Sequence, residues 1–237
     1  MDGVEGATGP GGLSRRTFVS RSAMLAGAAI LGQVPGFVAR QGWLDEARAQ
    51  TPDMTNDTLN GFVAFVVPGP DAYSVAQGQS TPEPGGIDAG ATALLMETVN
   101  KYAGSSGSSG LPGAEAIATM LNQVAVRVNP AAAAGPFPSA FARLRFEEKV
   151  ETMRQLEQDT EGSVLRAISG TLIGITAFLA YSEGGVLDRG RRETTAEPVG
   201  WKISRYDGVA EGRDELIGYW KGKRSSRTAP RYRVGKR

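Results

Sequence analysis

The chain contains neither histidine nor cysteine among its 237 residues. Without an imidazole or a thiol, it has no Ser-His-Asp triad, no Cys-His pair and no histidine general base. Zinc, copper and haem sites normally use His or Cys ligands, so their absence argues against those cofactors on this chain. Disulfides are also excluded, and packing must stabilise the fold. Carboxylates, lysines and tyrosines remain as groups that can carry chemistry.

The N-terminus has the features of a bacterial twin-arginine leader. The run Ser14-Arg15-Arg16-Thr17-Phe18-Val19 combines a Ser, an arginine pair, a Phe and an aliphatic residue, although Ser20 replaces the Lys that often follows. Residues 23–32 are apolar, but this stretch is too short and too rich in small residues to span a membrane. The order of these features predicts export by the twin-arginine translocase.

Small residues that fit a signal-peptidase site follow the apolar stretch. Ala47 and Ala49 occupy the two positions that such a peptidase reads, and Gln50 is then the first mature residue. We therefore predict a signal peptide over residues 1–49 and a location outside the cytoplasm, periplasmic or peripheral to the membrane. The residues predicted to carry the export signal are Ser14, Arg15, Arg16, Phe18, Ala47 and Ala49.

Charge is unevenly distributed along the rest of the chain, although the net charge is only +1. Residues 50–220 hold 13 basic and 21 acidic residues, whereas residues 221–237 hold 8 basic residues and no acidic one. We expect an acidic body with a solvated, disordered basic tail; docking of the tail on an acidic partner or an anionic lipid surface is the alternative. An acidic, exported body argues against a nucleic-acid partner.

Apolar residues at spacings of three and four predict a helical protein, because period-two alternation is nearly absent. We expect an all-α fold with one compact helical domain over residues 50–220, long Gly-, Pro- and Ser-rich loops, and an irregular C-terminal region. Residues 104–110 are typical of a flexible linker inside that domain. The predicted helices are 55–67, capped by Thr55, Asn56 or Asp57, then 88–102, 114–128, 147–158 and 161–181, with a short one at 212–219.

The segment from 161 to 181 is the most apolar of these helices. Gly170 and Gly174 lie one turn apart, and Phe178 widens the apolar stripe. A Gly-x-x-x-Gly pair also occurs in membrane helix dimers. The uncharged run from 167 to 181 is, however, shorter than the ~20 residues that a bilayer requires. We therefore predict a buried central helix whose glycines admit a neighbouring helix, and no transmembrane span after cleavage.

No group of residues in the sequence indicates a catalytic, cofactor or metal site. Glu147, Glu148 and Glu151 accompany Lys149 and Arg154 on one predicted helix, which favours a solvated charged face. A second acidic cluster, from 207 to 215, lacks a second group that would divide acid and base roles. No Gly-x-Gly-x-x-Gly or Gly-Lys-Ser motif provides a phosphate cradle.

Several segments, taken in order, resemble the gluconate 2-dehydrogenase subunit 3 family. The match covers about 150 residues and is most specific at Val199-Gly200-Trp201-Lys202-Ile203-Ser204-Arg205-Tyr206-Asp207-Gly208. A Pro-hydrophobic-Tyr-Gly-Gly-Asn element that many relatives carry before it is absent, and Glu183-Gly184-Gly185-Val186-Leu187-Asp188 keeps only its glycines. The other matching segments are the twin-arginine leader, Val66-Val67-Pro68-Gly69, Gly85-Gly86-Ile87-Asp88-Ala89, the Phe141/Phe146 segment and Phe178-Leu179-Ala180-Tyr181-Ser182.

The resemblance implies an accessory role. Members of this family accompany flavin-dependent dehydrogenases of the glucose–methanol–choline type, in which the large subunit carries FAD and a cytochrome often accepts the electrons. The small subunit supplies the export signal and supports folding of the large one. We therefore expect a non-catalytic subunit with no cofactor of its own and a catalytic flavoprotein as partner.

Aromatic residues near the C-terminus are the candidates for contact with that partner, because aromatic side chains commonly anchor interfaces. Packing of these residues on the chain's own helices is the alternative. A stand-alone extracytoplasmic enzyme or solute-binding domain that uses carboxylates and Tyr is the alternative function. The candidate interface residues are Gly200, Trp201, Lys202, Tyr206, Tyr219 and Trp220.

Overall fold

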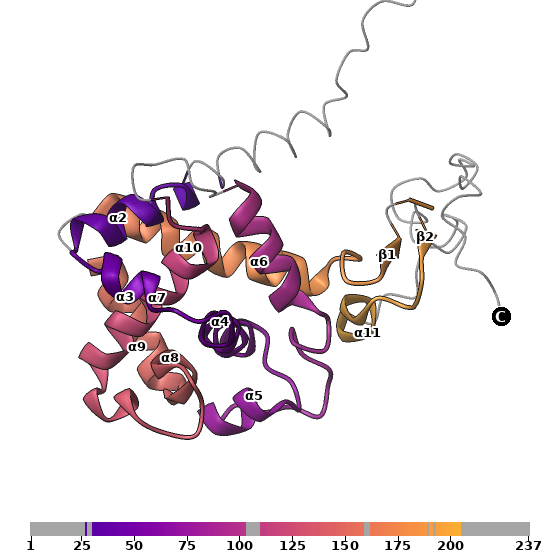
Figure 1. The fold of residues 1–237 in the computed structure, drawn as a ribbon. Coiled ribbons are helices and arrows are strands. Elements are labelled where there is room, and N and C mark those ends of the chain that lie inside the picture. The colour runs from indigo at the N-terminus through magenta and orange to yellow at the C-terminus, as the bar shows by residue number, and fades with distance from the viewer. Residues whose placement is uncertain are drawn as a thin grey trace, which may run out of the picture.

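The computed structural model describes residues 27, 30–102, 110–158, 162–188, 190–191 and 193–204. Over these ranges the fold is all-α, which confirms the predicted class (Figure 1). The described residues pair as strands only at β1 (Leu187–Asp188) and β2 (Glu193–Thr194), which run antiparallel over two residues each. The predicted linker at 104–110, apart from Gly110, the predicted helix at 212–219 and the basic tail lie outside the described residues.

Both short and long connections join the helices. In chain order they are α2 (Val34–Arg40), α3 (Leu44–Arg48), α4 (Pro52–Val66), α5 (Ala72–Gln77), α6 (Ala91–Tyr102), α7 (Gly113–Val128), the 3-10 turn η1 (Pro130–Ala133), α8 (Ala140–Arg143), α9 (Phe146–Gln158), α10 (Gly162–Tyr181) and α11 (Val199–Ser204).

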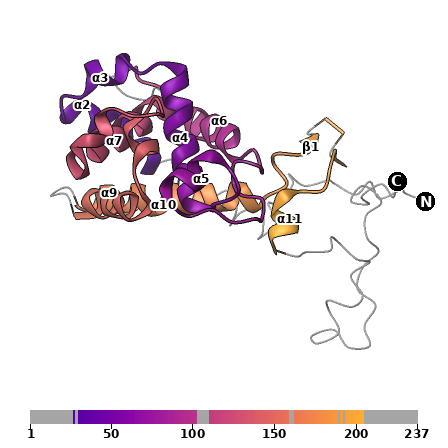
Figure 2. The same cartoon turned by 90° about the horizontal axis from the view of Figure 1, so that it is seen from below.

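Helix α7 lies at the centre of the body and packs against α2, α3, α4, α6, α8 and α9. Its apolar residues Ile117, Leu121 and Val124 recur at helical spacing and are buried, so one face meets the core. Helices α9 and α10 pack on each other and form a layer along one side of the body, below α7 in the view of Figure 2.

Helix α4 begins earlier than the sequence predicted. Its N-cap is Thr51, whose Oγ1 accepts a hydrogen bond from the Met54 N–H at 3.1 Å, and Pro52 occupies the first turn. The expected caps at Thr55 to Asp57 were wrong, because those residues lie inside the helix with Thr55 and Asp57 buried. Between the predicted helices 55–67 and 88–102, the structure forms an additional short helix, α5.

The core extends into the segment predicted as the end of the leader. Leu31, Val34, Phe37 and Val38 are at most 1% exposed and belong to the same hydrophobic cluster as α7. Helices α2 and α3 both pack on α7. Buried residues up to Ala47, which the sequence places before the mature start at Gln50, therefore belong to the packed body of the molecule.

Helix α10 is only half-buried, which corrects the prediction of a buried central helix. Leu165, Ile168 and Leu172 point into the core, but Gly170 and Gly174 are exposed. No described atom lies within 4 Å of the position that a Cβ on either glycine would take. Within the described part of the chain, no helix combines the length and the apolar character needed to cross a bilayer.

Candidate partner interface

The C-terminal described segment projects from the end of α10. Figure 1 places β1, β2 and α11 beyond the α10 terminus, to one side of the helical body, and Figure 2 shows β1 and α11 there as well. Helix α11 packs on α10, which itself packs on α6. Residues 85–89, 178–188 and 199–204 therefore come together at this end of the molecule.

Glycines form the contacts between these segments. A Cβ on Gly200 would lie 2.5 Å from Tyr181 Cα, so only glycine lets α11 approach the end of α10 this closely. A Cβ on Gly185 would overlap the Ala89 carbonyl oxygen. Both Gly200 and Gly185 belong to segments that the resemblance singled out, and the structure explains them by backbone packing.

A second close backbone contact lies under α6. A Cβ on Gly69 would lie 2.5 Å from the Gly85 nitrogen, and the Gly85 N–H donates a hydrogen bond to Asp88 Oδ2 at 2.8 Å. The chain after α4 thus meets the loop before α6 backbone to backbone. Between this loop and the C-terminal segment lies a small hollow of about 120 Å³, lined by Asp88, Ala89, Gly90, Ser182, Gly185, Val186, Pro198 and Val199.

The predicted interface residues fall into different surroundings. Gly200 is buried, Trp201 is half-buried on α11, and Lys202 is exposed. The Lys202 Nζ lies 4.0 Å from Glu197 Oε2, a solvent-exposed pair that contributes little stability. Tyr206, Tyr219 and Trp220 lie outside the described residues. So do the export residues Ser14, Arg15, Arg16 and Phe18, whereas Ala47 and Ala49 lie in and just after α3.

Exposed large apolar side chains lie near the end of α10 and on β1, and the sequence analysis missed them. Phe178 is 65% exposed and Tyr181 is 46% exposed, both on α10, while Leu187 on β1 is 39% exposed. The prediction that Phe178 belongs to the buried stripe was wrong. Phe178 lies four residues after Gly174 on the same exposed face, but neither an apolar side chain nor a glycine indicates in the sequence that the face is open.

Away from the C-terminal segment, buried polar groups form a cluster centred on Lys149. Its side chain is fully buried, and its Nζ donates hydrogen bonds to Gln77 Oε1 at 2.8 Å and to the Gly61 carbonyl at 3.0 Å. The Phe141 ring centroid lies 5.4 Å away. Burial lowers the pKa of Lys149 to about 7, against the opposing fields of Asp71 and Asp57. The prediction that Lys149 belongs to a solvated face was therefore wrong.

Asp57 and Tyr73 form the adjoining part of this cluster. The Tyr73 hydroxyl donates to Asp57 Oδ1 at 2.8 Å, and the Ser139 N–H donates to Asp57 Oδ2 at 2.9 Å. Burial, then the hydrogen bond to Asp57, raises the pKa of Tyr73 to about 12. The Tyr73 ring also stacks on Phe137 at 4.8 Å. Asp57 thus links α4, α5 and the start of α8, and both of its carboxylate oxygens are occupied.

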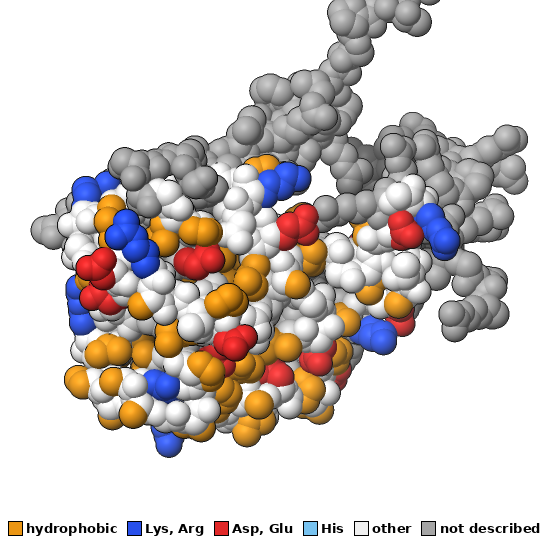
Figure 3. Space-filling model, in the orientation of Figure 1, with side chains coloured by type: hydrophobic (Ala, Val, Ile, Leu, Met, Phe, Trp, Pro, Cys, Tyr) orange, Lys and Arg blue, Asp and Glu red, His pale blue; other side chains and the backbone are white. Residues whose placement is uncertain are grey.

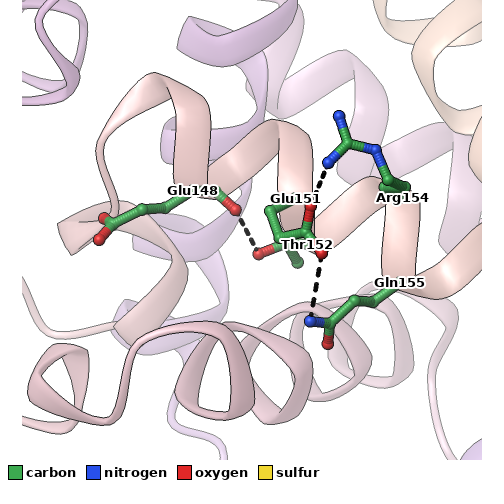
Figure 4. Close-up of polar contacts among 5 residues, drawn as sticks. All are labelled: Glu148, Glu151, Thr152, Arg154 and Gln155. Carbon is green, nitrogen blue, oxygen red and sulfur yellow. Dashed lines mark hydrogen bonds and ion pairs between the residues drawn. The ribbon is translucent and has the colours of Figure 1, made fainter.

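Glu148 and Glu151 of α9 point in different directions (Figure 4). Glu148 accepts hydrogen bonds from Asn129 Nδ2 and from the Arg145 N–H, both at 2.8 Å. Glu151 forms an ion pair with Arg154 and accepts a hydrogen bond from Gln155. Glu148 therefore caps the start of α9, and Glu151 balances the charge of Arg154. Their two carboxylates do not converge on a common point.

No group of three or more metal-ligating side chains occurs within the described ranges. Comparisons with protein-family models, with curated proteins and with solved structures give no match to this chain.

Proposed function

We propose that this chain is the non-catalytic small subunit of an exported flavin-dependent dehydrogenase. It supplies the twin-arginine signal through Ser14, Arg15, Arg16 and Phe18 and supports folding and assembly of a catalytic subunit that carries FAD. A cytochrome subunit is the expected electron acceptor. The complex then works in the periplasm or at the outer face of the cytoplasmic membrane.

The observation that carries this proposal is that residues 85–89, 178–188 and 199–204, which belong to resembling segments, meet at one end of the molecule. Gly200 meets Tyr181, and Gly185 meets Ala89, so segments far apart in the sequence form one surface. Exposed Phe178 and Tyr181 border that surface. Large aromatic side chains left open beside a rigid backbone contact are suited to anchoring a protein partner.

The alternative, a stand-alone enzyme that uses carboxylates and Tyr, finds less support among the described residues. The Asp57–Tyr73 pair is the only described pair of this kind with a resolved pKa shift, and each Asp57 oxygen already accepts a hydrogen bond. Lys149 is fully buried and hydrogen-bonded. These groups hold helices together and offer no open face to a substrate.

Affinity purification of the tagged full chain from its native host, followed by a flavin spectrum, tests the proposal. We expect a larger protein with bound flavin to co-purify with it from the extracytoplasmic fraction. The chain by itself should carry no visible chromophore. A chromophore that stays with the isolated subunit through gel filtration contradicts the non-catalytic assignment.

The matched variant is Arg15→Lys combined with Arg16→Lys, which keeps the charge but removes both guanidinium groups. Because the twin-arginine pathway reads the arginine pair, we expect the subunit and its flavoprotein to remain in the cytoplasm. Normal export of the double variant contradicts the assigned route, and unchanged extracytoplasmic dehydrogenase activity after deletion of the gene contradicts the accessory role.

A further inference from the structure

The segment from Leu31 to Ala49 is built into the hydrophobic core. Trp43 is 8% exposed and packs edge-on against Phe37, with ring centroids 5.7 Å apart. The Arg127 guanidinium, which α7 supplies, lies 4.8 Å from the Trp43 ring centroid. Ala47 is 2% exposed. Side chains of this segment thus fill space against α7 that no other described segment occupies.

The backbone at the Ala47–Ala49 junction is helical and hydrogen-bonded. The Ala47 N–H donates to the Trp43 carbonyl at 3.0 Å, and the Ala49 N–H donates to the Asp45 carbonyl at 2.9 Å. Only Ala49, Gln50 and Thr51 separate the end of α3 from the start of α4. An endopeptidase binds its substrate as locally unfolded chain. Ala49 itself is exposed, but the residues before it are held in α3, which would have to unfold before the junction could be cut.

We propose that residues 31–49 are a permanent structural element of the folded subunit and that the junction after Ala49 is not cut in the folded protein. Removal of this segment would uncover the faces of α7 and its neighbours that Phe37, Val38 and Trp43 now cover. The small residues at Ala47 and Ala49 then serve packing, and any processing of the leader takes place before Leu31.

Amide hydrogen exchange on the purified full chain tests the packing. We expect the amides of 37–50 to exchange at least ~100-fold more slowly than an unstructured chain, in the range measured for the α7 amides 113–128. Exchange of 37–50 at the unstructured rate, with α7 protected, overturns the proposal. The measurement requires no partner, so it stays decisive even if the accessory role is wrong.

Two further measurements address stability and cutting. In the full chain, Phe37→Ala or Trp43→Ala should lower the melting temperature by several degrees, whereas Arg48→Ala, whose side chain is 67% exposed, should not. Equal melting temperatures for all three variants overturn the proposal.

Incubation of the native chain with bacterial signal peptidase should give no product that begins at Gln50. Such a product from the native chain overturns the proposal as well. The heat-unfolded chain is the control for the peptidase.

Discussion

At the residue scale, Lys149 is the most unusual side chain in the described structure. A fully buried ammonium group loses its hydration, and only the Gly61 carbonyl, Gln77 Oε1 and the Phe141 ring replace it. The lowered pKa follows from this environment. Lys149 also joins α9 to α4 and α5, so the same contacts position three helices.

The lowered pKa has a defined consequence for stability. The amine titrates near 10.5 in the unfolded chain and near 7 in the folded one, so between these pH values the unfolded chain holds a proton that the folded chain has released. The free energy of unfolding must therefore rise with pH across this window. From pH 7 to pH 9 this group should contribute a rise of about 2 kcal/mol.

We predict that Lys149→Met abolishes this rise. It should also cost about 1–3 kcal/mol at pH 9, because the Gly61 carbonyl and Gln77 Oε1 lose their donor. Urea unfolding at pH 7, 8 and 9 measures both effects. Lys101→Met, at an exposed position on α6, is the control and should keep the slope of the parent. Parallel pH profiles for the parent and Lys149→Met would show that the prediction is wrong.

The burial of Lys149 was partly predictable from spacing. The buried residues of α9 are Lys149, Thr152, Met153 and Leu156, at intervals of three, one and three that define one helical face. The sequence analysis assigned Lys149 to a solvated charged face instead, because a Lys among glutamates is normally solvated. Its partners Gln77 and Gly61 come from distant helices, and a single sequence does not reveal that pairing.

At the element scale, α10 has two different sides. Leu165, Ile168 and Leu172 bind it to the body, while Gly170, Gly174 and Phe178 face outward. The length of this helix was predictable, because apolar residues recur at helical spacing over its whole length. The sequence did not reveal which side of α10 is exposed to solvent. Glycines carry no hydrophobic signal, and they suit both a close helix contact and an exposed surface.

Two glycine substitutions distinguish an exposed glycine from one that makes a close helix contact. Gly174→Ala should raise the free energy of unfolding by about 0.5–1 kcal/mol, because alanine favours the helix and no described atom opposes its Cβ. Gly200→Ala should detach α11, because its Cβ collides with the backbone of Tyr181. Thermal unfolding measures the first, and amide exchange over 199–204 measures the second. Loss of stability in Gly174→Ala would indicate a neighbour on that face.

The residue at which a helix begins was less predictable from the sequence than the presence of the helix. The cap of α4 at Thr51 lies four residues before the earliest predicted cap. The capping pattern alone did not decide where the helix begins, because four residues in this segment have capping side chains: Thr51, Thr55, Asn56 and Asp57. Pro52 contained the deciding signal, since proline favours the first helical turn. Asp57 instead holds Tyr73 and Ser139, a role that depends on contacts across the fold.

At the scale of the whole molecule, Figure 3 shows a face on which acidic and basic side chains are interspersed. Its apolar side chains gather over the lower part, in the area where Figure 1 labels α5 and α8. Val75 on α5 is 61% exposed. The molecule therefore has an exposed apolar area away from α11. A substitution in this area can serve as the control in an experiment on assembly.

We predict that assembly depends on the α10–α11 end. Trp201→Ala and Phe178→Ser should each leave the subunit folded and lower extracytoplasmic dehydrogenase activity. Loss of a buried interface aromatic typically costs about 2–4 kcal/mol, or roughly thirty-fold or more in affinity. Val75→Ser is the matched control and should leave activity unchanged. Pull-down of the flavoprotein and the melting temperature of each variant measure the two effects.

Two outcomes would contradict this prediction. Unfolding of the isolated subunit by Trp201→Ala would assign this half-buried residue to the core. Equal retention of the flavoprotein by Phe178→Ser and Val75→Ser would show that the exposed end of α10 is not the contact.

The packing of α2 and α3 on α7 also has a consequence for the order of events during synthesis. The end of α7 lies ~90 residues after the end of α2, so at ~5–20 residues per second the ribosome releases α2 ~4–18 s before α7 is complete. During that interval the segment 31–49 has no surface on which to pack. A chaperone or peptidase that meets the nascent chain early finds this segment open, whereas one that arrives after α7 has folded finds it covered.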